Sequence, residues 1–393
     1  MVRLAIILGL LGLVGPFAID MYLPALPTIA GDLGATEAQI QTTLTAYFIT
    51  FGIGQLFYGP MADQTGRKAP IVLGLAIFLA GSIGAAFATS AGSLTLWRAL
   101  QGLGGASLMV VTRAVIRDRY TGPDATRLMA MLMLVISVSP MLAPLAGSLV
   151  IALSGWRAVF GTLAVLAAVN LVLAVFLLPE TLPRDRRVPV NLASMRRGAG
   201  VLLRDPLFMG LTFIGGFGMA SFFVFIASAS FVYTDQFGMS PTGFSLAFAL
   251  NAVGFFGASQ VAAGLGARYG ITRVVRLAVA GFFLVTVTLA LLALAGLASL
   301  PVIMALLFCG NACLGLVIPT TMVLALDEHG DIAGLASSLG GTLQMLAGGL
   351  MIVVSGLFFD GTATPMLLAI AMCSTISFVL TLVVLSGRSR AAA

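Results

Sequence analysis

The connection that follows the second long apolar run of the chain reads GPMADQTGRK, residues 59–68. A second connection, residues 264–273, reads GLGARYGITR, and its Gly270 lies 204 residues after Gly66. Both connections are short, rich in glycine and basic at their ends. Matched features half a chain apart indicate an internal duplication, so we predict that the chain consists of two similar halves.

The composition around these connections is that of a membrane protein. The chain has 393 residues, of which 60% are hydrophobic and 9% charged, and its mean hydropathy is +1.10. A soluble domain carries about 25% charged residues, so this composition excludes soluble enzymes, secreted disulfide scaffolds and nucleic-acid-binding proteins. The net charge of +6 does not change this, because the basic residues lie at the ends of apolar runs.

The apolar runs predict an all-α membrane protein with twelve transmembrane helices in two six-helix bundles. We expect a bundle over 1–178, a cytoplasmic linker over 179–206 and a second bundle over 207–393. The first run begins near residue 4 without a small-residue cleavage pattern, so we expect a retained span. The predicted spans are 4–27, 38–61, 69–89, 92–116, 126–153, 157–178, 207–233, 242–266, 274–298, 300–325, 333–358 and 364–386.

The basic residues predict the orientation of the spans. Alternate connections hold nearly all of them, whereas the opposite set holds only Arg157, so both termini are expected in the cytoplasm. The linker repeats apolar residues on one helical face, at 192, 195, 199 and 202, which predicts either a surface helix on anionic lipid or a solvated connection. The basic residues on the cytoplasmic set are Arg3, Arg67, Lys68, Arg113, Arg117, Arg119, Arg127, six arginines between 184 and 204, Arg268, Arg273, Arg276, Arg388 and Arg390.

Two ionisable residues lie well inside the predicted spans, Asp20 in the first and Arg98 in the fourth. At 1.5 Å per residue, both lie roughly 9 to 10 Å below the outer ends of their spans. Burying a charge in hydrocarbon costs about 2.5 to 3.5 kcal/mol on insertion scales, so each needs a partner, water or a function. We predict that Asp20 takes up and releases a proton while Arg98 tunes its proton affinity. The alternative is a static ion pair that locks two spans together.

Other polar residues inside the spans are candidates for substrate contact. On the fourth span Arg98, Gln101, Gly105 and Met109 share one face, and the small residues around them would let a neighbouring helix approach closely. Each amide inside a span either contacts substrate or makes an interhelical hydrogen bond, and both possibilities stay open. These amides are Gln55, Gln101, Asn170, Asn251, Gln260, Asn311 and Gln344.

The fifth span carries Pro140, Pro144 and Gly147 at spacings of four and three. Such residues free backbone carbonyls and bend a helix, so the segment is either a hinge or a static kink. The three cysteines lie within apolar runs and the chain has one histidine, which predicts no metal site. A single intramembrane acid also predicts no catalytic centre.

Together these residues resemble the major facilitator superfamily, and within it the Bcr/CflA group of drug:proton antiporters. The first connection is similar to the superfamily's loop signature at Gly59, Asp63, Gly66, Arg67 and Lys68, and Arg98 with Gly102 is similar to its fourth-span signature. Segments similar to members of the group are Asp20–Pro27, Arg117–Asp118, Ala143–Pro144 with Gly147, Pro179–Pro183, and Ala333–Gly334 with Ala336–Ser338.

The resemblance implies a proton-driven antiporter that works by alternating access, with spans one, four, seven and ten around a central cavity. It places Asp20 and Arg98 on one cavity wall. It also implies a cytoplasmic gate in which Arg67 pairs with Asp118, and Asp63 lies near Ile332 at the amino end of span eleven. For the substrate cavity we predict Tyr22, Tyr47, Gln101, Asn251, Asn311 and Gln344.

Two residues depart from the family pattern. Gly12 stands where some related exporters carry a second acid, so neutral or zwitterionic substrates are favoured. Ala267 stands where Asp63 would correspond in the second half, so the gate should be asymmetric.

We therefore expect a multi-pass exporter of small drugs or antibiotics in a bacterial inner membrane, driven by the proton gradient without a cofactor. Its expected partners are a small-molecule substrate, protons and membrane lipid, with no nucleic acid, and it should be a monomer. The alternative is an exporter of an endogenous metabolite or amino acid whose drug resistance is incidental. A channel would not saturate, and an enzyme would need a cluster of catalytic groups in the spans.

Overall fold

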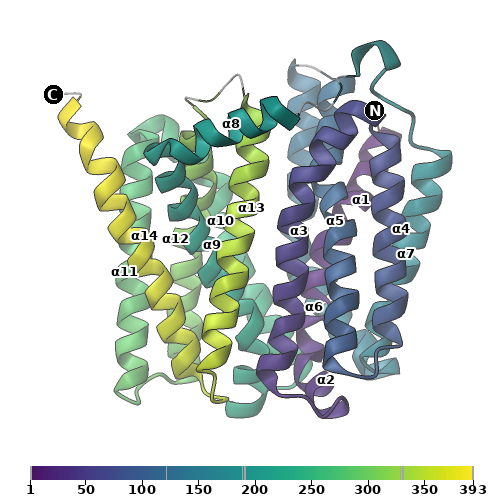
Figure 1. Ribbon diagram of the computed structural model, residues 1–393. Helices are drawn as coiled ribbons and strands as arrows, with labels where there is room; N and C mark the ends of the chain where they lie inside the picture. Colours follow the sequence, from purple (N-terminus) through teal and green to yellow (C-terminus); the bar gives the residue numbers. More distant parts are fainter. Residues whose placement is uncertain are drawn as a thin grey trace. The chain divides into compact units, whose positions relative to one another are not determined.

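The computed structural model describes residues 2–120, 122–187, 189, 192–327, 329 and 332–391, and every regular element within these ranges is a helix. The chain divides into two compact units, Met1–Leu192 and Ala193–Ala393 (Figure 1). The side chains of Arg3, Arg127, Arg388 and Arg390, which entered the orientation prediction, lie outside the described part of the chain.

The first unit consists of long helices that follow the first six predicted spans. The first span is broken: α1 ends at Asp20, and a short helix η1 and α2 continue it past Pro24 and Pro27. Proline removes a backbone donor and fixes φ, which accounts for the break. The elements are α1 (Val2–Asp20), η1 (Leu23–Ala25), α2 (Leu26–Asp32), α3 (Glu37–Thr65), α4 (Lys68–Ala86), α5 (Ala91–Arg119), α6 (Gly122–Ser154), α7 (Arg157–Phe176) and the short η2 (Arg184–Arg186).

The second unit begins with the linker helix α8, on which Leu202 is buried while Arg196, Arg197 and Arg204 are exposed. The linker thus contains a helix, and its contact with lipid stays a prediction. The elements are α8 (Leu192–Arg204), α9 (Pro206–Phe231), the π-helical turn η3 (Val232–Gln236), α10 (Pro241–Tyr269), α11 (Ile271–Leu294), α12 (Leu300–Leu326), α13 (Ala333–Leu357) and α14 (Ala363–Ala391).

Helix packing repeats between the units. In the first unit α5 packs on α3 and α4, α1 packs on α6, and α7 packs on α4. In the second unit α12 packs on α10 and α11, α9 packs on α13, and α14 packs on α11. The pairs correspond when α1, α3, α4, α5, α6 and α7 are matched in order with α9, α10, α11, α12, α13 and α14. Each unit therefore repeats one arrangement of six long helices, as the duplicated connection predicted.

The glycines of the two matched connections adopt the same unusual backbone conformation. Gly66 ends α3 with φ of 95°, and Gly270 ends α10 with φ of 85°. This left-handed region disfavours side chains and makes glycine the natural residue after a helix. The preceding helix starts are also alike, because Thr36 and Ser240 each accept a backbone N–H of the first turn, from Gln39 and Gly243.

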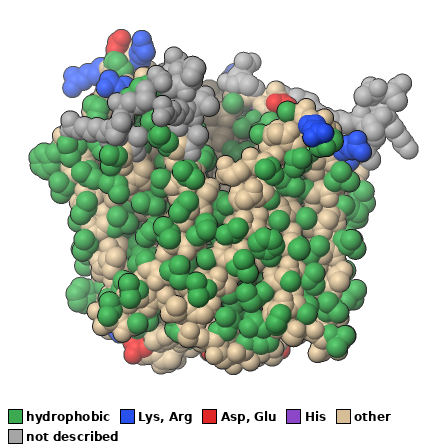
Figure 2. Space-filling view, turned by 180° about the vertical axis from the view of Figure 1, so that it is seen from behind, with side chains coloured by type: hydrophobic (Ala, Val, Ile, Leu, Met, Phe, Trp, Pro, Cys, Tyr) green, Lys and Arg blue, Asp and Glu red, His purple; other side chains and the backbone are tan. Residues whose placement is uncertain are grey.

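The outer surfaces of the helices are apolar. Large hydrophobic side chains such as Phe57, Leu153, Phe176 and Leu284 are more than 60% exposed. In the face shown in Figure 2, hydrophobic side chains cover the middle of the helices and the charged ones lie near their ends. Such a surface suits lipid as the surrounding solvent.

Length and composition make eleven described helical stretches long and apolar enough to cross a membrane. The first of these joins α1, η1 and α2. Helix α3 has 29 residues but is not among the eleven, because its glutamines and threonines lower its mean hydropathy.

Candidate functional site

A fully buried arginine is the central feature of the first unit. The guanidinium carbon of Arg98, on α5, lies 4.7 Å from the ring centre of Tyr22 and 4.5 Å from that of Tyr47. All three side chains are 0% exposed. A cation over two aromatic faces gains about 2 kcal/mol or more per face when water is excluded. The tyrosines predicted to line the substrate cavity therefore enclose Arg98 in this structure.

Hydrogen bonds fix this arginine between three helices. Its Nη1 donates to the backbone oxygen of Ala18 on α1, at 2.9 Å, and to Oε1 of Gln101, at 2.8 Å. The Nε2 of Gln101 in turn donates to Oγ of Ser82 on α4, at 2.7 Å. Gln101 is 0% exposed, so its amide is used within the unit as a link between α4 and Arg98.

The two tyrosines are themselves held in place. The hydroxyl of Tyr22 shares a hydrogen bond of 2.8 Å with Thr43 on α3, and the hydroxyl of Tyr47 donates to the backbone oxygen of Gly15, at 3.3 Å. A Cβ at Gly102 would run into the backbone oxygen of Tyr47, so only glycine lets α5 approach α3 this closely. The close approach predicted for the small residues of the fourth span is thus present.

Part of the guanidinium has no partner. Within the described residues, Nε and Nη2 of Arg98 make no hydrogen bond, although both are buried. Asp20 ends α1 two residues after Ala18 and is 4% exposed. No ion pair within 4 Å joins Asp20 to Arg98 in the part of the chain that the structure describes. The static ion pair considered from the sequence is therefore not formed.

The proline-rich segment of the fifth span lies against this region. Pro140 and Pro144 are inside α6, which continues unbroken from Gly122 to Ser154. A Cβ at Gly147 would run into the backbone of Met21, the residue after Asp20. The segment predicted as a hinge is therefore packed directly on the end of α1.

A second cluster joins the helix ends around the connection 59–68. Arg67 donates through Nε and Nη2 to the two carboxylate oxygens of Asp118 on α5, at 2.7 and 3.2 Å, and through Nη1 to Asp63, at 2.5 Å. The Arg67 side chain is 9% exposed and that of Asp118 is 15% exposed. A two-pronged contact of this kind is among the strongest that arginine makes. Gly59 of the same motif packs against Val110 of α5.

The cluster contains one residue to which sequence analysis gave no role. Oε1 and Oε2 of Glu180 accept the backbone N–H groups of Arg67, at 2.8 Å, and of Lys68, at 3.2 Å, at the start of α4. A Cβ at Gly66 would run into the same carboxylate. Burial opposes the charged form, but the backbone N–H groups of Leu182, Arg67, Lys68 and Thr181 hold the pKa of Glu180 below its ordinary value.

This carboxylate ties the segment after α7 to the amino terminus of α4, where negative charge is favoured. Thr181 adds a hydrogen bond of 3.2 Å to Asp118, and the Nζ of Lys68 donates to the backbone oxygen of Val175. The only sequence signal for a role of Glu180 was that the segment Pro179–Pro183 resembles members of the family. The expected place of Asp63 near Ile332 joins the two units and stays a prediction.

In the second unit, two of the predicted cavity amides contact each other. The Nδ2 of Asn311 on α12 donates to Oδ1 of Asn251 on α10, at 3.2 Å, and Asn251 donates to the backbone oxygen of Ala247. Asn251 is 0% and Asn311 6% exposed. In this structure the two amides form a hydrogen bond between α10 and α12.

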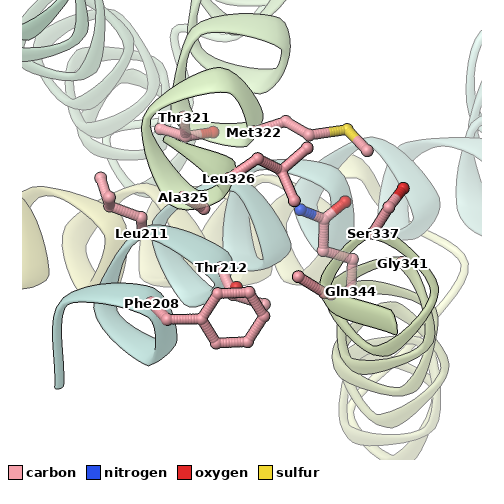
Figure 3. A pocket seen from close by; sticks show the side chains of 12 residues that line it. Phe208, Leu211, Thr212, Thr321, Met322, Ala325, Leu326, Ser337, Gly341 and Gln344 are labelled. Atoms are coloured by element: carbon pink, nitrogen blue, oxygen red, sulfur yellow. The ribbon is translucent and has the colours of Figure 1, made fainter. Parts of the chain in front are cut away.

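The remaining predicted amide, Gln344 on α13, lines a pocket inside the second unit (Figure 3). The pocket lies between α9, α12 and α13 and has a volume of about 30 Å³. Figure 3 shows the amide of Gln344 reaching from α13 toward α12, with the ring of Phe208 across the pocket. The lining residues are Phe208, Leu211, Thr212, Thr321, Met322, Ala325, Leu326, Ala336, Ser337, Gly340, Gly341 and Gln344.

Close to Phe208, a hydrogen bond between side chains connects two segments of the second unit. The Nε2 of His329 lies 2.7 Å from Oδ2 of Asp205, which precedes α9, and the His329 and Phe208 rings are 5.7 Å apart. Burial opposes the charged form of Asp205, but His329 and the N–H groups of Leu207 and Phe208 lower its pKa. Among the described residues, no three His, Cys, Asp or Glu side chains gather in a way that would hold a metal ion.

Comparison with known proteins identifies the family of the chain and several similar proteins. Residues 8–352 match the family model described as Major Facilitator Superfamily. The chain is 32% identical over 365 residues to an uncharacterized MFS-type transporter, YdgK, of Bacillus subtilis (strain 168), covering 92% of this chain and 90% of the relative. It is 30% identical over 371 residues to the bicyclomycin resistance protein homolog of Haemophilus influenzae, with 94% and 93% covered.

A solved structure of a D-xylose-proton symporter is similar with a TM-score of 0.75 at 16% identity, covering 97% of this chain and 96% of that one. At this identity the likeness shows the fold alone.

Proposed function

The chain belongs to the major facilitator superfamily and has its all-α, multi-pass membrane fold, and on that premise we propose that it exports small drugs or antibiotics in exchange for protons. Export would take place across a bacterial inner membrane by alternating access, with both termini in the cytoplasm and the proton gradient as the driving force. One observation carries the proposal: Arg98 is fully buried, and two of its nitrogens have no partner among the described residues. Because a buried unpaired charge is expensive, its retention indicates a function.

In the proposed cycle, Asp20 is protonated from the outside. The neutral acid then accepts no hydrogen bond from Nε or Nη2 of Arg98. When Asp20 loses its proton toward the cytoplasm, the new carboxylate becomes an acceptor for the free Nε–H and Nη2–H of Arg98. The hydrogen bond from Nη1 to Ala18 keeps the guanidinium beside the end of α1 through both states. Proton release and movement of α1 are thereby coupled through one side chain.

The segment of α6 around Gly147 gives this movement a mechanical partner. It is packed on Met21, so a shift at the end of α1 acts directly on the helix that carries Pro140 and Pro144. Prolines leave α6 with fewer internal hydrogen bonds, which lowers the cost of bending it. The cluster of Arg67, Asp118 and Glu180 holds the helix ends of the first unit together while this occurs.

The proposed substrates are neutral or zwitterionic. Gly12 leaves the first span without a second acid, and a Cβ there would lie 2.8 Å from the Leu132 side chain, so that position is filled by packing. The pocket beside Gln344 has no charged lining residue. The name of the Haemophilus relative links that protein to bicyclomycin, which makes bicyclomycin a suitable first substrate to test.

The test uses the purified full-length chain in liposomes that contain a pH-sensitive dye. An imposed pH gradient should drive uphill accumulation of bicyclomycin, and bicyclomycin flux should in turn move protons in the opposite direction. Collapsing the pH gradient with an ionophore should abolish accumulation while leaving downhill exchange. Accumulation that persists without the gradient would contradict proton coupling. A panel of uncharged antibiotics in an efflux-deficient host extends the test to other substrates.

A further inference from the structure

The pocket of the second unit has an unusual combination of lining groups. Twelve residues line it, and none of them carries a charge. The nearby side chains of Asp205 and His329 lie beside Phe208 and are hydrogen-bonded to each other, at 2.7 Å. A charged ligand group would therefore lose its water in the pocket without gaining a counter-charge, which is costly.

Three polar side chains of the pocket have unused hydrogen-bonding capacity. Within the described residues, the amide of Gln344 and the hydroxyls of Ser337 and Thr212 make no hydrogen bond, whereas Thr321 donates to the backbone oxygen of Val317. An amide offers two donors and an oxygen acceptor, and each hydroxyl can donate or accept. The pocket thus presents both donors and acceptors that are free to bind a ligand.

Glycines on the facing helix hold the amide in place. A Cβ at Gly215 of α9 would lie 3.1 Å from Nε2 of Gln344 and 2.8 Å from Oγ1 of Thr321, and one at Gly216 would lie 3.5 Å from Cγ of Gln344. The two glycines form a cradle that a larger residue would fill. The amide is therefore positioned by packing while its hydrogen bonds stay open, as expected of a preorganised binding group.

The size of the pocket limits what enters it. A volume of about 30 Å³ holds one or two waters or a small polar group. Leu211, Met322 and Leu326 provide apolar wall beside that space. An amphipathic molecule can place one amide, carbonyl or hydroxyl group here and lay its apolar part along these side chains.

We infer that this pocket, inside the second unit between α9, α12 and α13, is a binding subsite for the uncharged polar group of a transported molecule. Gln344 is the main residue that recognises this group, and the hydroxyls of Ser337 and Thr212 provide further hydrogen bonds to it. The inference rests on the proposed export function and adds to it the part of the chain that selects uncharged amide- or hydroxyl-bearing substrates.

The first experiment measures equilibrium binding of radiolabelled bicyclomycin to the purified full-length chain. Gln344→Leu keeps the side-chain size but removes the amide, so binding should weaken about five- to tenfold, the loss of one or two neutral hydrogen bonds. The matched control is Gln260→Leu, which makes the same change on α10 at an exposed glutamine outside the pocket. That variant should bind like the parent. Equal affinity of the parent and Gln344→Leu would overturn the inference.

A second measurement does not depend on the folding of the Gln344 variant. Ser337→Cys is made in a chain whose three native cysteines are replaced, and its alkylation by N-ethylmaleimide is timed with and without bicyclomycin. Saturating bicyclomycin should slow alkylation at position 337 at least fivefold. The control is Ser299→Cys, at an exposed helix start without a side-chain cap to lose, where the rate should not change.

The outcomes separate the two proposals. If bicyclomycin is transported against its gradient but neither protects position 337 nor depends on Gln344, the subsite is wrong and the export function stands. If the parent chain neither binds nor transports bicyclomycin or any other uncharged antibiotic of the panel, both proposals fall. Protection at 337 together with weakened binding of Gln344→Leu supports the subsite.

Discussion

Arg98 in the first unit and Asn311 in the second stand at matching helix positions. Arg98 lies one turn before Gly102, where a Cβ would run into Tyr47 of α3, and Asn311 lies one turn before Gly315, where a Cβ would run into Phe255 of α10. At this position the first unit buries a charge between two tyrosines, whereas the second makes a hydrogen bond between two amides. The same close helix packing thus surrounds a charged side chain in the first unit and an uncharged one in the second.

The matched connections differ in the same direction. Arg67 is almost buried and contacts Asp63 and Asp118, whereas Arg268 is exposed and stacks over Tyr269, with 5.2 Å to the ring centre. Ala267 provides no acid there. The comparison shows that two units with the same helix arrangement can carry different chemistry. The first unit holds the ionisable groups, and the second holds an uncharged pocket.

The largest effect is expected from removing the buried charge. Arg98→Met should lower uphill transport at least 100-fold, about 2.7 kcal/mol in barrier terms. The free energy of unfolding should change by no more than about 1 kcal/mol, because the lost hydrogen bonds and cation–π contacts are offset by the removed desolvation cost of the buried charge. The corresponding change in the second unit, Asn311→Leu, should cost about 0.6 kcal/mol of stability and reduce transport only a few-fold. Equal transport losses for the two variants would break the comparison.

The connection 59–68 gives the next largest effect, on stability. Arg67→Ala leaves Asp118 partly buried without its guanidinium, and the free energy of unfolding should fall by about 3 kcal/mol. Arg268→Ala, at a basic residue of the second connection, should cost less than about 0.5 kcal/mol, because its side chain is exposed. Unfolding of both variants in mixed micelles measures the difference. Similar losses would show that the connection of the first unit is no more tightly held than that of the second.

Glu180 predicts a pH dependence that is confined to the first unit. Its pKa is lowered from an ordinary value of 4.5, so its stabilising contribution is fully present above that value and is lost as the pH falls through the lower folded value. Glu180→Gln should cost about 1.5 kcal/mol of unfolding free energy at neutral pH. The difference from the parent should shrink as the pH falls below the ordinary value of 4.5. A difference that stays constant across this range would show that charge is not what Glu180 contributes.

The smallest effect concerns the link between Asp205 and His329. His329→Gln removes one hydrogen bond, but Asp205 keeps the N–H of Leu207 at 2.8 Å, so the loss should be about 1 kcal/mol or less. Transport of bicyclomycin should be unchanged, because the pair satisfies itself beside the pocket. A large loss of transport with little loss of stability would extend the pocket to include His329.

Sequence analysis predicted the helices and the duplication well, because apolar runs, prolines and glycines act locally. The two connections that share a positive φ at Gly66 and Gly270 are an example. The depth estimate placed Asp20 and Arg98 at one height but said nothing about direction around the helices, so it did not distinguish an ion pair from the enclosure of Arg98 by tyrosines.

The features that were missed depend on contacts between distant segments. Glu180 binds backbone groups 113 and 112 residues earlier in the chain, and no periodicity connects these positions. The hydrogen bond from Gln101 to Ser82 and the pocket beside Gln344 likewise depend on how side chains of different helices pack. The sequence pattern alone does not show this packing.

The most direct measurement of proton coupling in the first unit uses Asp20→Asn in liposomes. Downhill exchange of bicyclomycin and uphill accumulation driven by a pH gradient are measured in the same preparation. We predict that exchange continues, because the second unit still binds the uncharged drug, while uphill accumulation and drug-linked proton movement are lost. Uphill accumulation at the parental rate in Asp20→Asn would contradict the account.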